Sequence, residues 1–261
     1  GLLSICSMLA WGLGYFGVPQ VLLRFMAIRK EEELVRSRRI AMIWVVISLA
    51  VAVFIGIAGR ALFPVEHLTK TSAENIFITL ATSSLPPILA GFVMAGILAA
   101  TISSSDSYLL IAASAFAKNI FQGVFKKKAS DKQVMTVTRI TLLAIALIAI
   151  VIALDEESVI FNIVSFAWAG FGAAFGPVVL FGLFWRRTNK WGAISGMIAG
   201  GATVFLWKFI VRKAFAGTWL DIYELLPAFI VGCIVIVVVS LLTKEPEKDI
   251  TDIYDELKKV K

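Results

Sequence analysis

The chain has 261 residues, of which 59% are hydrophobic and 16% are charged, and its formal net charge is +7. Its mean hydropathy of +0.88 excludes an ordinary soluble domain and predicts an integral membrane protein. Alternating β-barrel patterns of about ten residues are absent from the sequence, so we expect all-α spans.

Seven apolar windows with few or no charges approach or exceed the length of about 20 residues that a membrane-spanning helix needs. In chain order these windows cover residues 1–23, 40–59, 75–105, 140–154, 158–185, 191–207 and 225–243. The fourth window extends to 133–154 if Arg139 lies at the membrane rim. We place the helix of the third window at about Pro87 to Ala117.

Basic residues alternate between the connections that join these windows. Twenty Lys and Arg residues lie in residues 24–39, 118–139, 186–190 and after residue 243, whereas five lie in the other connections. Because positive charge favours cytoplasmic loops, the C-terminus is predicted to be cytoplasmic and residue 1 to be outside. The positive charge thus reports membrane topology, and no nucleic-acid partner is expected.

The first window contains WGLGYFGVPQ, residues 11–20. Gly12, Gly14 and Gly17 weaken a helix, and Pro19 removes a backbone hydrogen bond, so a break is predicted here. Broken helices near the bilayer midplane present free backbone groups that bind solutes. On an α-helix, the side chains of Trp11, Tyr15 and Pro19 would form one face and one wall of such a site. Aromatic packing beside a proline kink is the alternative.

The third window contains AATISSSDSY, which places several hydroxyls and a carboxylate in an apolar span. Ala100, Ser103, Ser104 and Ser107 share one helical stripe, and the middle serines fall near the bilayer midplane. Such a stripe offers hydroxyls and freed carbonyls, the oxygen ligands that a small hard cation such as sodium prefers. Back-bonding to the helix and close helix packing are the alternatives for one or two of the serines.

Asp106 follows Ala100 by six residues, so its side chain points about 120° away from the stripe. We do not expect it to bind the same ion directly. An intramembrane carboxylate is costly and suggests a function. Three interpretations remain open: a water-filled inner pathway, a second cation site, or a hydrogen bond between helices.

Glycines recur every fourth residue in the fifth and sixth windows, a spacing that favours close helix packing. Trp168, Phe171 and Phe175 stand in this glycine-rich stretch and are candidates for lining a gate. The chain ends in a short tail, residues 244–261. The apolar residues of this tail have helical spacing, which indicates either an amphipathic helix or a solvated, frayed end. These apolar residues are Ile250, Ile253, Tyr254, Leu257 and Val260.

Four long segments together resemble one known family. They are WGLGYFGVPQ, GILAATISSSDSYLL, SFAWAGFGAAFGPVVLF and GAISGMIAGGATVFLWK. In this order and at these separations, the segments resemble the C-terminal half of the sodium/proline symporters of the sodium/solute symporter family. The resemblance runs from Gly1 to about Thr243. It implies a leucine-transporter-like inverted-repeat fold, of which this chain would hold the second repeat and two additional C-terminal helices.

The resemblance also implies site residues, which agree with the patterns above. The family's sodium site corresponds to the Ala100 carbonyl and to the Ser103 and Ser104 hydroxyls. Trp11, Tyr15 and Pro19 correspond to its substrate-side helix, with the tyrosine at the inner gate. No role is carried over to Asp106. The transported partners would be sodium and a small solute, foremost L-proline, in a lipid bilayer and without an organic cofactor.

The remaining sodium ligands would come from the first helix of the first repeat, which is missing here. Because the chain begins at Gly1 inside an apolar run, we interpret residues 1–243 as the C-terminal transmembrane region of a longer transporter. The alternatives are a symporter of this fold for another small organic solute and a transporter-like input module of a membrane sensor. The spans contain no histidine and no paired carboxylates, so an enzyme is not expected.

Overall fold

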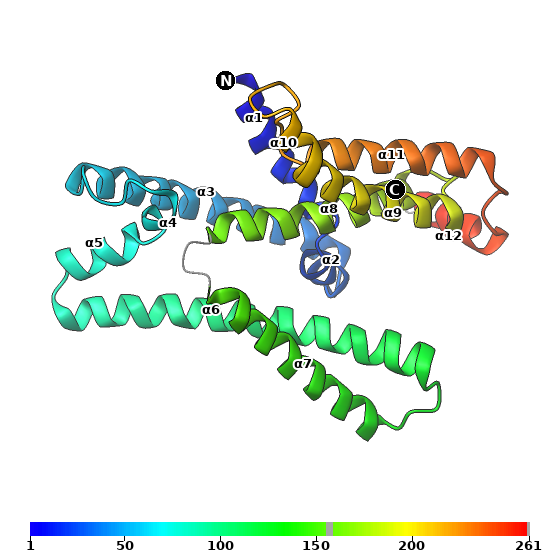
Figure 1. Ribbon diagram of the computed structural model, residues 1–261. Helices are drawn as coiled ribbons and strands as arrows, with labels where there is room; N and C mark the ends of the chain where they lie inside the picture. The colour runs from blue at the N-terminus through cyan, green and yellow to red at the C-terminus, as the bar shows by residue number, and fades with distance from the viewer. Residues whose placement is uncertain (155–158, 260–261) are drawn as a thin grey trace. The chain divides into compact units, whose positions relative to one another are not determined.

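The computed structural model describes residues 1–154 and 159–259 (Figure 1). The first residue of the fifth window, residue 158, and Val260 of the tail pattern lie outside these described residues. All regular elements within them are helical. The chain divides into two units: one comprises Gly1–Ile28 and Phe161–Lys261, and the other comprises Arg29–Ile160.

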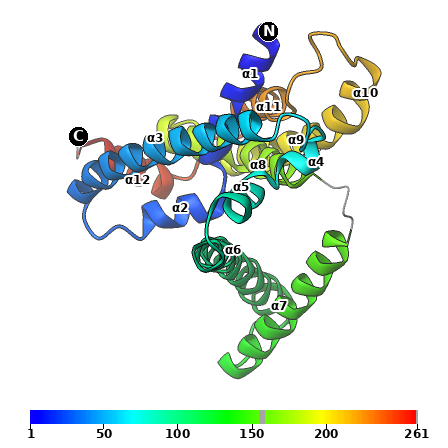
Figure 2. The ribbon, with the colours of Figure 1, turned by 90° about the vertical axis from the view of Figure 1, so that its left-hand side faces the viewer.

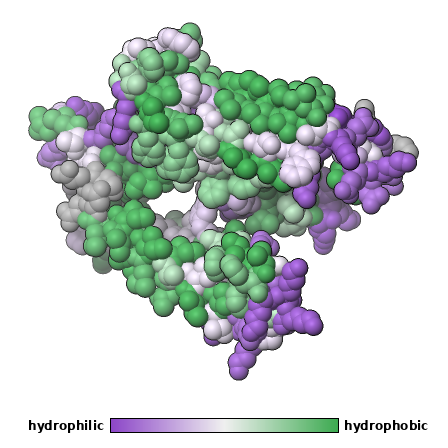
Figure 3. Space-filling view, turned by 45° about the vertical axis from the view of Figure 1, so that its right-hand side comes forward, coloured by the Kyte–Doolittle hydropathy of each residue, from purple (hydrophilic) through white to green (hydrophobic). Residues whose placement is uncertain are grey.

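The described residues contain six helices that are long and apolar enough to cross a membrane. A bent pair, Leu2–Phe16 with Pro19–Met26, passes the same test with a bend of 49° and gives a seventh candidate if the pair is counted as one span. This agrees with the seven predicted spans. Apolar side chains cover the sides of the long helices, whereas hydrophilic side chains gather at helix ends, as a membrane protein requires (Figure 3).

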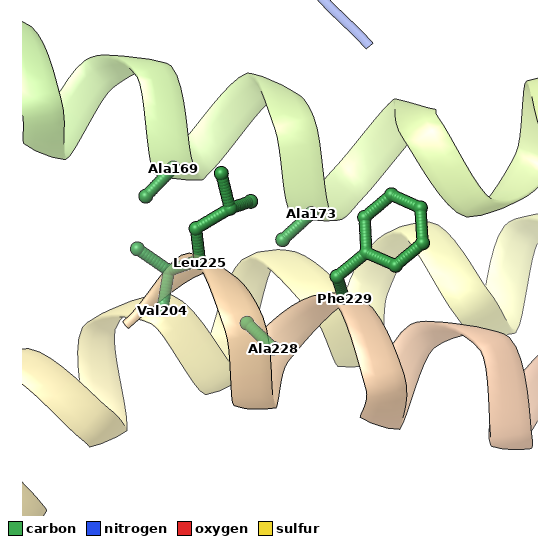
Figure 4. Close-up of a cluster of buried hydrophobic side chains, with 6 residues drawn as sticks. All are labelled: Ala169, Ala173, Val204, Leu225, Ala228 and Phe229. Carbon is green, nitrogen blue, oxygen red and sulfur yellow. The ribbon is translucent and has the colours of Figure 1, made fainter. Parts of the chain in front are cut away.

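The first unit begins with the broken span and continues with three long helices. Its elements are α1 (Leu2–Ala10), the 3-10 helix η1 (Trp11–Phe16), α2 (Pro19–Met26), α8 (Ile160–Phe184), α9 (Lys190–Leu206), the π-helix η3 (Trp207–Val211), α10 (Arg212–Ala214), α11 (Leu225–Leu242) and α12 (Lys248–Lys259). The core of this unit joins α8, α9 and α11 (Figure 4). It consists of Ala169, Ala173, Val204, Leu225, Ala228 and Phe229.

Glycines bring the helices of the first unit close together, as their spacing predicted. A side chain on Gly192 would collide with Ser240 of α11, and one on Gly196 would collide with Ile236. Gly200 instead lies against the backbone of α8 at Ala173. Small residues at these positions therefore let α9 approach two neighbours at backbone distance.

The tail forms the helix α12, so the helical interpretation of that segment is correct. Its Asp255 accepts hydrogen bonds from Arg186, in the connection between α8 and α9, at 2.9 Å from Nε and 2.8 Å from Nη2. Tyr254 donates a hydrogen bond of 3.1 Å to the carbonyl of Phe184. These contacts attach the tail to one end of α8.

The second unit holds α3 (Glu31–Leu62), α4 (Lys70–Ala73), α5 (Ile76–Ser84), α6 (Pro87–Ala115), the π-helix η2 (Phe116–Phe125) and α7 (Asp131–Ala153). Short helices α4 and α5 lead from α3 to α6 (Figure 2). Gly59 of α3 packs against side chains of α5. A small cluster of Ala117, Ala129 and Val134 packs η2 against the start of α7.

Helix boundaries differ from the predicted windows where polar residues extend a span. The helix of the second window, α3, begins at Glu31 rather than at residue 40, because three glutamates in its first turn suit a helix N-terminus. The third window divides at Leu85 and Pro86 into α5 and α6. The start of α6 at Pro87 is the predicted one.

Candidate functional site

The broken first span has the break that its glycines and proline predicted. The α-helix α1 gives way at Trp11 to the 3-10 helix η1, which ends at Phe16, with Gly17 as its C-cap. Val18 has an extended backbone, with φ of −80° and ψ of 117°, and Pro19 occupies the first turn of α2. Proline is favoured there because its missing N–H has no partner in the first helical turn.

Two glycines of the break lie directly against α8. A side chain on Gly14 would overlap the indole of Trp168, and one on Gly17 would overlap the carbonyl of Phe171. On the α8 side, Gly172 lies against the Cα atom of Gly14. The broken segment therefore docks on α8 through contacts that leave no room for a Cβ atom.

Trp168 is the residue that joins Trp11 to Tyr15. Its indole Nε1–H donates a hydrogen bond of 2.9 Å to the Trp11 carbonyl. The rings of Trp168 and Trp11 stack with centroids 5.5 Å apart. The Tyr15 ring meets Trp168 edge to face at 4.9 Å. The fifth-span aromatic residue that we considered for a gate thus contacts the broken span.

The predicted α-helical face of Trp11, Tyr15 and Pro19 is not formed. A 3-10 helix turns by about 120° per residue, so residues four apart on η1 do not share a face. Pro19 belongs to a separate helix beyond the bend. The side chains of Trp11 and Tyr15 nevertheless both contact Trp168. Helical periodicity could not predict these contacts, because Trp168 lies on another helix.

Tyr15 presents a polar group that the protein leaves accessible. The residue is 53% exposed, and its hydroxyl makes no hydrogen bond within the part of the chain that the structure describes. Trp11 is only partly buried, although its ring also stacks on Phe161 and Tyr223. The segment can therefore offer a phenol hydroxyl beside aromatic surface, which suits a small amphipathic solute.

The polar stripe lies in the second unit, on α6. This helix is continuous from Pro87 to Ala115, so the Ala100 carbonyl is not freed by a break, contrary to our expectation. A helical carbonyl still has a second lone pair with which it can bind a cation. Ala100, Ser103 and Ser104 are all exposed on the described part of the chain.

The serines of the stripe differ in their hydrogen bonds. The Ser107 hydroxyl donates to the Ser103 carbonyl at 3.3 Å, which is the back-bonding alternative considered above. The hydroxyls of Ser103 and Ser104 have no hydrogen-bond partner among the described residues. The hydroxyl oxygens of two consecutive residues on a spanning helix are therefore available to an ion.

Asp106 is exposed on the same helix. Within residues 1–154 and 159–259 its carboxylate makes no ion pair and no hydrogen bond. A hydrogen bond to a neighbouring helix is thus not seen in this structure. The other two interpretations of Asp106, an inner pathway and a second cation site, remain predictions.

Sequence reasoning missed the contacts of Tyr223, which lies just before α11. Its hydroxyl donates to the Ser165 carbonyl of α8 at 2.6 Å, and its backbone N–H donates to the Ser7 hydroxyl of α1 at 3.1 Å. Its ring stacks on Trp11 with centroids 6.0 Å apart. Only the proximity of Tyr223 to the acidic residues Asp221 and Glu224 in an apolar region could have drawn attention to it.

Comparison with known proteins adds information that the geometry lacks. The model of the sodium:solute symporter family matches residues 2–200. The chain is 42% identical to the high-affinity proline transporter PutP of Bacillus subtilis, over 97% of this chain and 52% of the relative. It is 43% identical to the sodium/proline symporter of Escherichia coli, over 93% of this chain and 48% of the relative.

A third relative, the sodium/proline symporter of Haemophilus influenzae, is 42% identical over 98% of this chain and 51% of its own length. The chain thus spans about half the length of the curated relatives it matches. No solved structure matches the chain significantly.

Proposed function

The chain belongs to the sodium:solute symporter family, and on this basis we propose that it forms the C-terminal half of a transporter that couples sodium influx to proline uptake. The family has the leucine-transporter-like fold, so this is an all-α integral membrane protein of that fold. Residues 1–243 form the transmembrane region in this proposal, and residues 244–261 form a cytoplasmic tail. The relatives named above are transporters, and no covalent chemistry is proposed.

The unpaired hydroxyls of Ser103 and Ser104 are the observation that carries the sodium part of the proposal. Hydroxyls inside a membrane favour a partner, and neither of these two bonds back to the described residues of its own helix as Ser107 does. In the proposal, sodium binds these two hydroxyls and the Ala100 carbonyl, and the N-terminal repeat supplies its remaining ligands. Asp106 then lies on an inner pathway or at a second cation site.

The solute part rests on the broken span. We assign Trp11, Tyr15 and Pro19 to the solute side, where the accessible Tyr15 hydroxyl and the adjoining aromatic rings recognise proline. The bend at Gly17 and Val18 supplies the irregular backbone that transporters use at a midplane site. Alternating access of this site to the two sides of the membrane would couple the two fluxes.

Uptake into proteoliposomes tests this function. The full-length transporter, reconstituted with an inward sodium gradient, is expected to accumulate radiolabelled proline above its external concentration. An equal potassium gradient is expected to produce no accumulation. Accumulation that is the same in both gradients would contradict sodium coupling.

A further inference from the structure

Four charged residues form a cluster where the π-helix η3 and α10 face the start of α11. Arg212 Nη1 lies 2.8 Å from Glu224 Oε2, and Arg212 Nε lies 3.1 Å from Asp221 Oδ1. Lys208 Nζ lies 3.9 Å from the other carboxylate oxygen of Glu224. Asp221 also accepts a hydrogen bond from the backbone N–H of Gly217 at 3.3 Å.

One carboxylate of this cluster is deeply buried. The Glu224 side chain is only 2% exposed, so its carboxylate depends on Arg212 and Lys208 to replace the water it has lost. Hydrogen bonds from Arg212 and Gly217 lower the pKa of Asp221, which keeps that carboxylate charged. Because one guanidinium binds both acids, it fixes the backbone on either side of Tyr223.

Tyr223 connects the charged cluster to the broken span and to α8. Its contacts reach Ser7 of α1, Ser165 of α8 and the ring of Trp11 in η1. Burial raises the pKa of the Tyr223 phenol, so the hydroxyl remains a hydrogen-bond donor. One side chain therefore connects the charged cluster to the broken span.

We infer that Arg212 and Glu224 are positioning residues for solute binding, which hold the Trp11 ring in place through Tyr223 without touching the solute. The inference rests on the proposed function, in which Trp11 lies on the solute side. Arg212 and Glu224 belong neither to the polar stripe of α6 nor to the broken span, so this role is separate from those two sites. The π-helix η3 and the short α10 place Lys208 and Arg212 so that both reach Glu224.

Proline binding to the purified full-length transporter at saturating sodium tests this role. Tyr223→Phe keeps the ring stack but removes the hydrogen bond to Ser165, so the Kd for proline is expected to rise about three- to tenfold. Arg212→Gln is expected to raise it at least as much. The number of binding sites and the sodium concentration for half-maximal binding at saturating proline should be unchanged.

Lys213→Gln is the matched control, because it removes the same charge from the neighbouring, exposed position. It is expected to bind proline like the wild type. If Arg212 acts through the Tyr223 ring, the double variant Arg212→Gln/Tyr223→Ala should bind proline no more weakly than Tyr223→Ala alone, whereas independent effects would multiply. Should Arg212→Gln fail to fold, Arg212→Gln/Glu224→Gln replaces it, since it leaves no unpaired carboxylate at residue 224.

Wild-type affinity in Tyr223→Phe and Arg212→Gln, or multiplied effects in the double variant, would overturn the inference. A loss of binding sites with unchanged Kd would also overturn it, because it would indicate a role in stability alone. A wild-type protein that fails to bind proline in sodium would instead contradict the proposed function. The two failures are thus distinguishable.

Discussion

The indole N–H of Trp168 donates a 2.9 Å hydrogen bond to the backbone carbonyl of Trp11, 157 positions earlier in the chain. This bond joins α8 to the broken span at the point where α1 gives way to η1. Gly14 provides the space for the indole. The geometry of the broken span therefore depends on α8 as well as on its own glycines and proline.

Gly14→Ala tests this docking. The added methyl group would overlap the Trp168 indole, so we expect the folded state to lose about 1–3 kcal/mol and proline uptake to fall sharply. Thermal unfolding of the purified protein and uptake in vesicles measure the two effects. Gly12→Ala is the control, since a side chain at Gly12 meets open space. Similar losses in both variants would refute the docking account.

Substitutions in the polar stripe test the sodium ligands. Ser103→Ala and Ser104→Ala should each raise the sodium concentration for half-maximal uptake by about tenfold or more, because each removes an oxygen ligand of a cation. Protein abundance should change little, and the double variant should nearly lose coupling. Ser105→Ala, which points about 140° from Ala100, is the control. Equal effects at all three serines would favour helix packing instead.

Changes at the broken span test the solute residues. Tyr15→Phe removes the accessible hydroxyl but keeps the edge-to-face contact with Trp168, so it should alter proline affinity while preserving stability. Trp11→Ala should weaken proline binding more than sodium binding. Measuring both affinities on the same purified sample separates the two effects. A Trp11→Ala variant that loses sodium and proline affinity equally would place its ring outside the solute site.

Cysteine labelling tests the membrane topology. After Cys6 and Cys233 are replaced, single cysteines at Glu32 and Lys127 should react with an impermeant reagent only from the cytoplasmic side. A cysteine at Lys70 should react only from outside. Labelling after permeabilisation provides the control for all three positions. The reverse pattern would invert the predicted orientation.

Hydrophobicity and residue type were sufficient to predict the spans, the break and the polar stripe. Both the break before Pro19 and the α-helix beginning at Pro87 are local consequences of proline and glycine chemistry. Local rules did not reveal that η1 is a 3-10 helix, and the predicted face of Trp11, Tyr15 and Pro19 is therefore wrong.

Contacts between segments far apart in the sequence could not be predicted from helical periodicity. The bond from Trp168 to Trp11 and the ion pairs of Arg212 with Asp221 and Glu224 depend on how helices meet. A charge in an apolar segment signals that a partner exists, but it does not say which residue the partner is. The polar stripe was predictable because its residues lie on a single helix.

Equilibrium binding of radiolabelled proline to the purified full-length transporter tests whether the binding of sodium and the binding of proline are coupled. Coupling free energy is reciprocal, so proline affinity should rise as sodium replaces potassium at constant ionic strength. Unlabelled proline should displace the label, whereas glycine betaine, pantothenate and glucose should not. If one of these solutes displaces the label better than proline, the substrate assignment is wrong, and if proline affinity is the same in sodium and in potassium, coupled symport is contradicted.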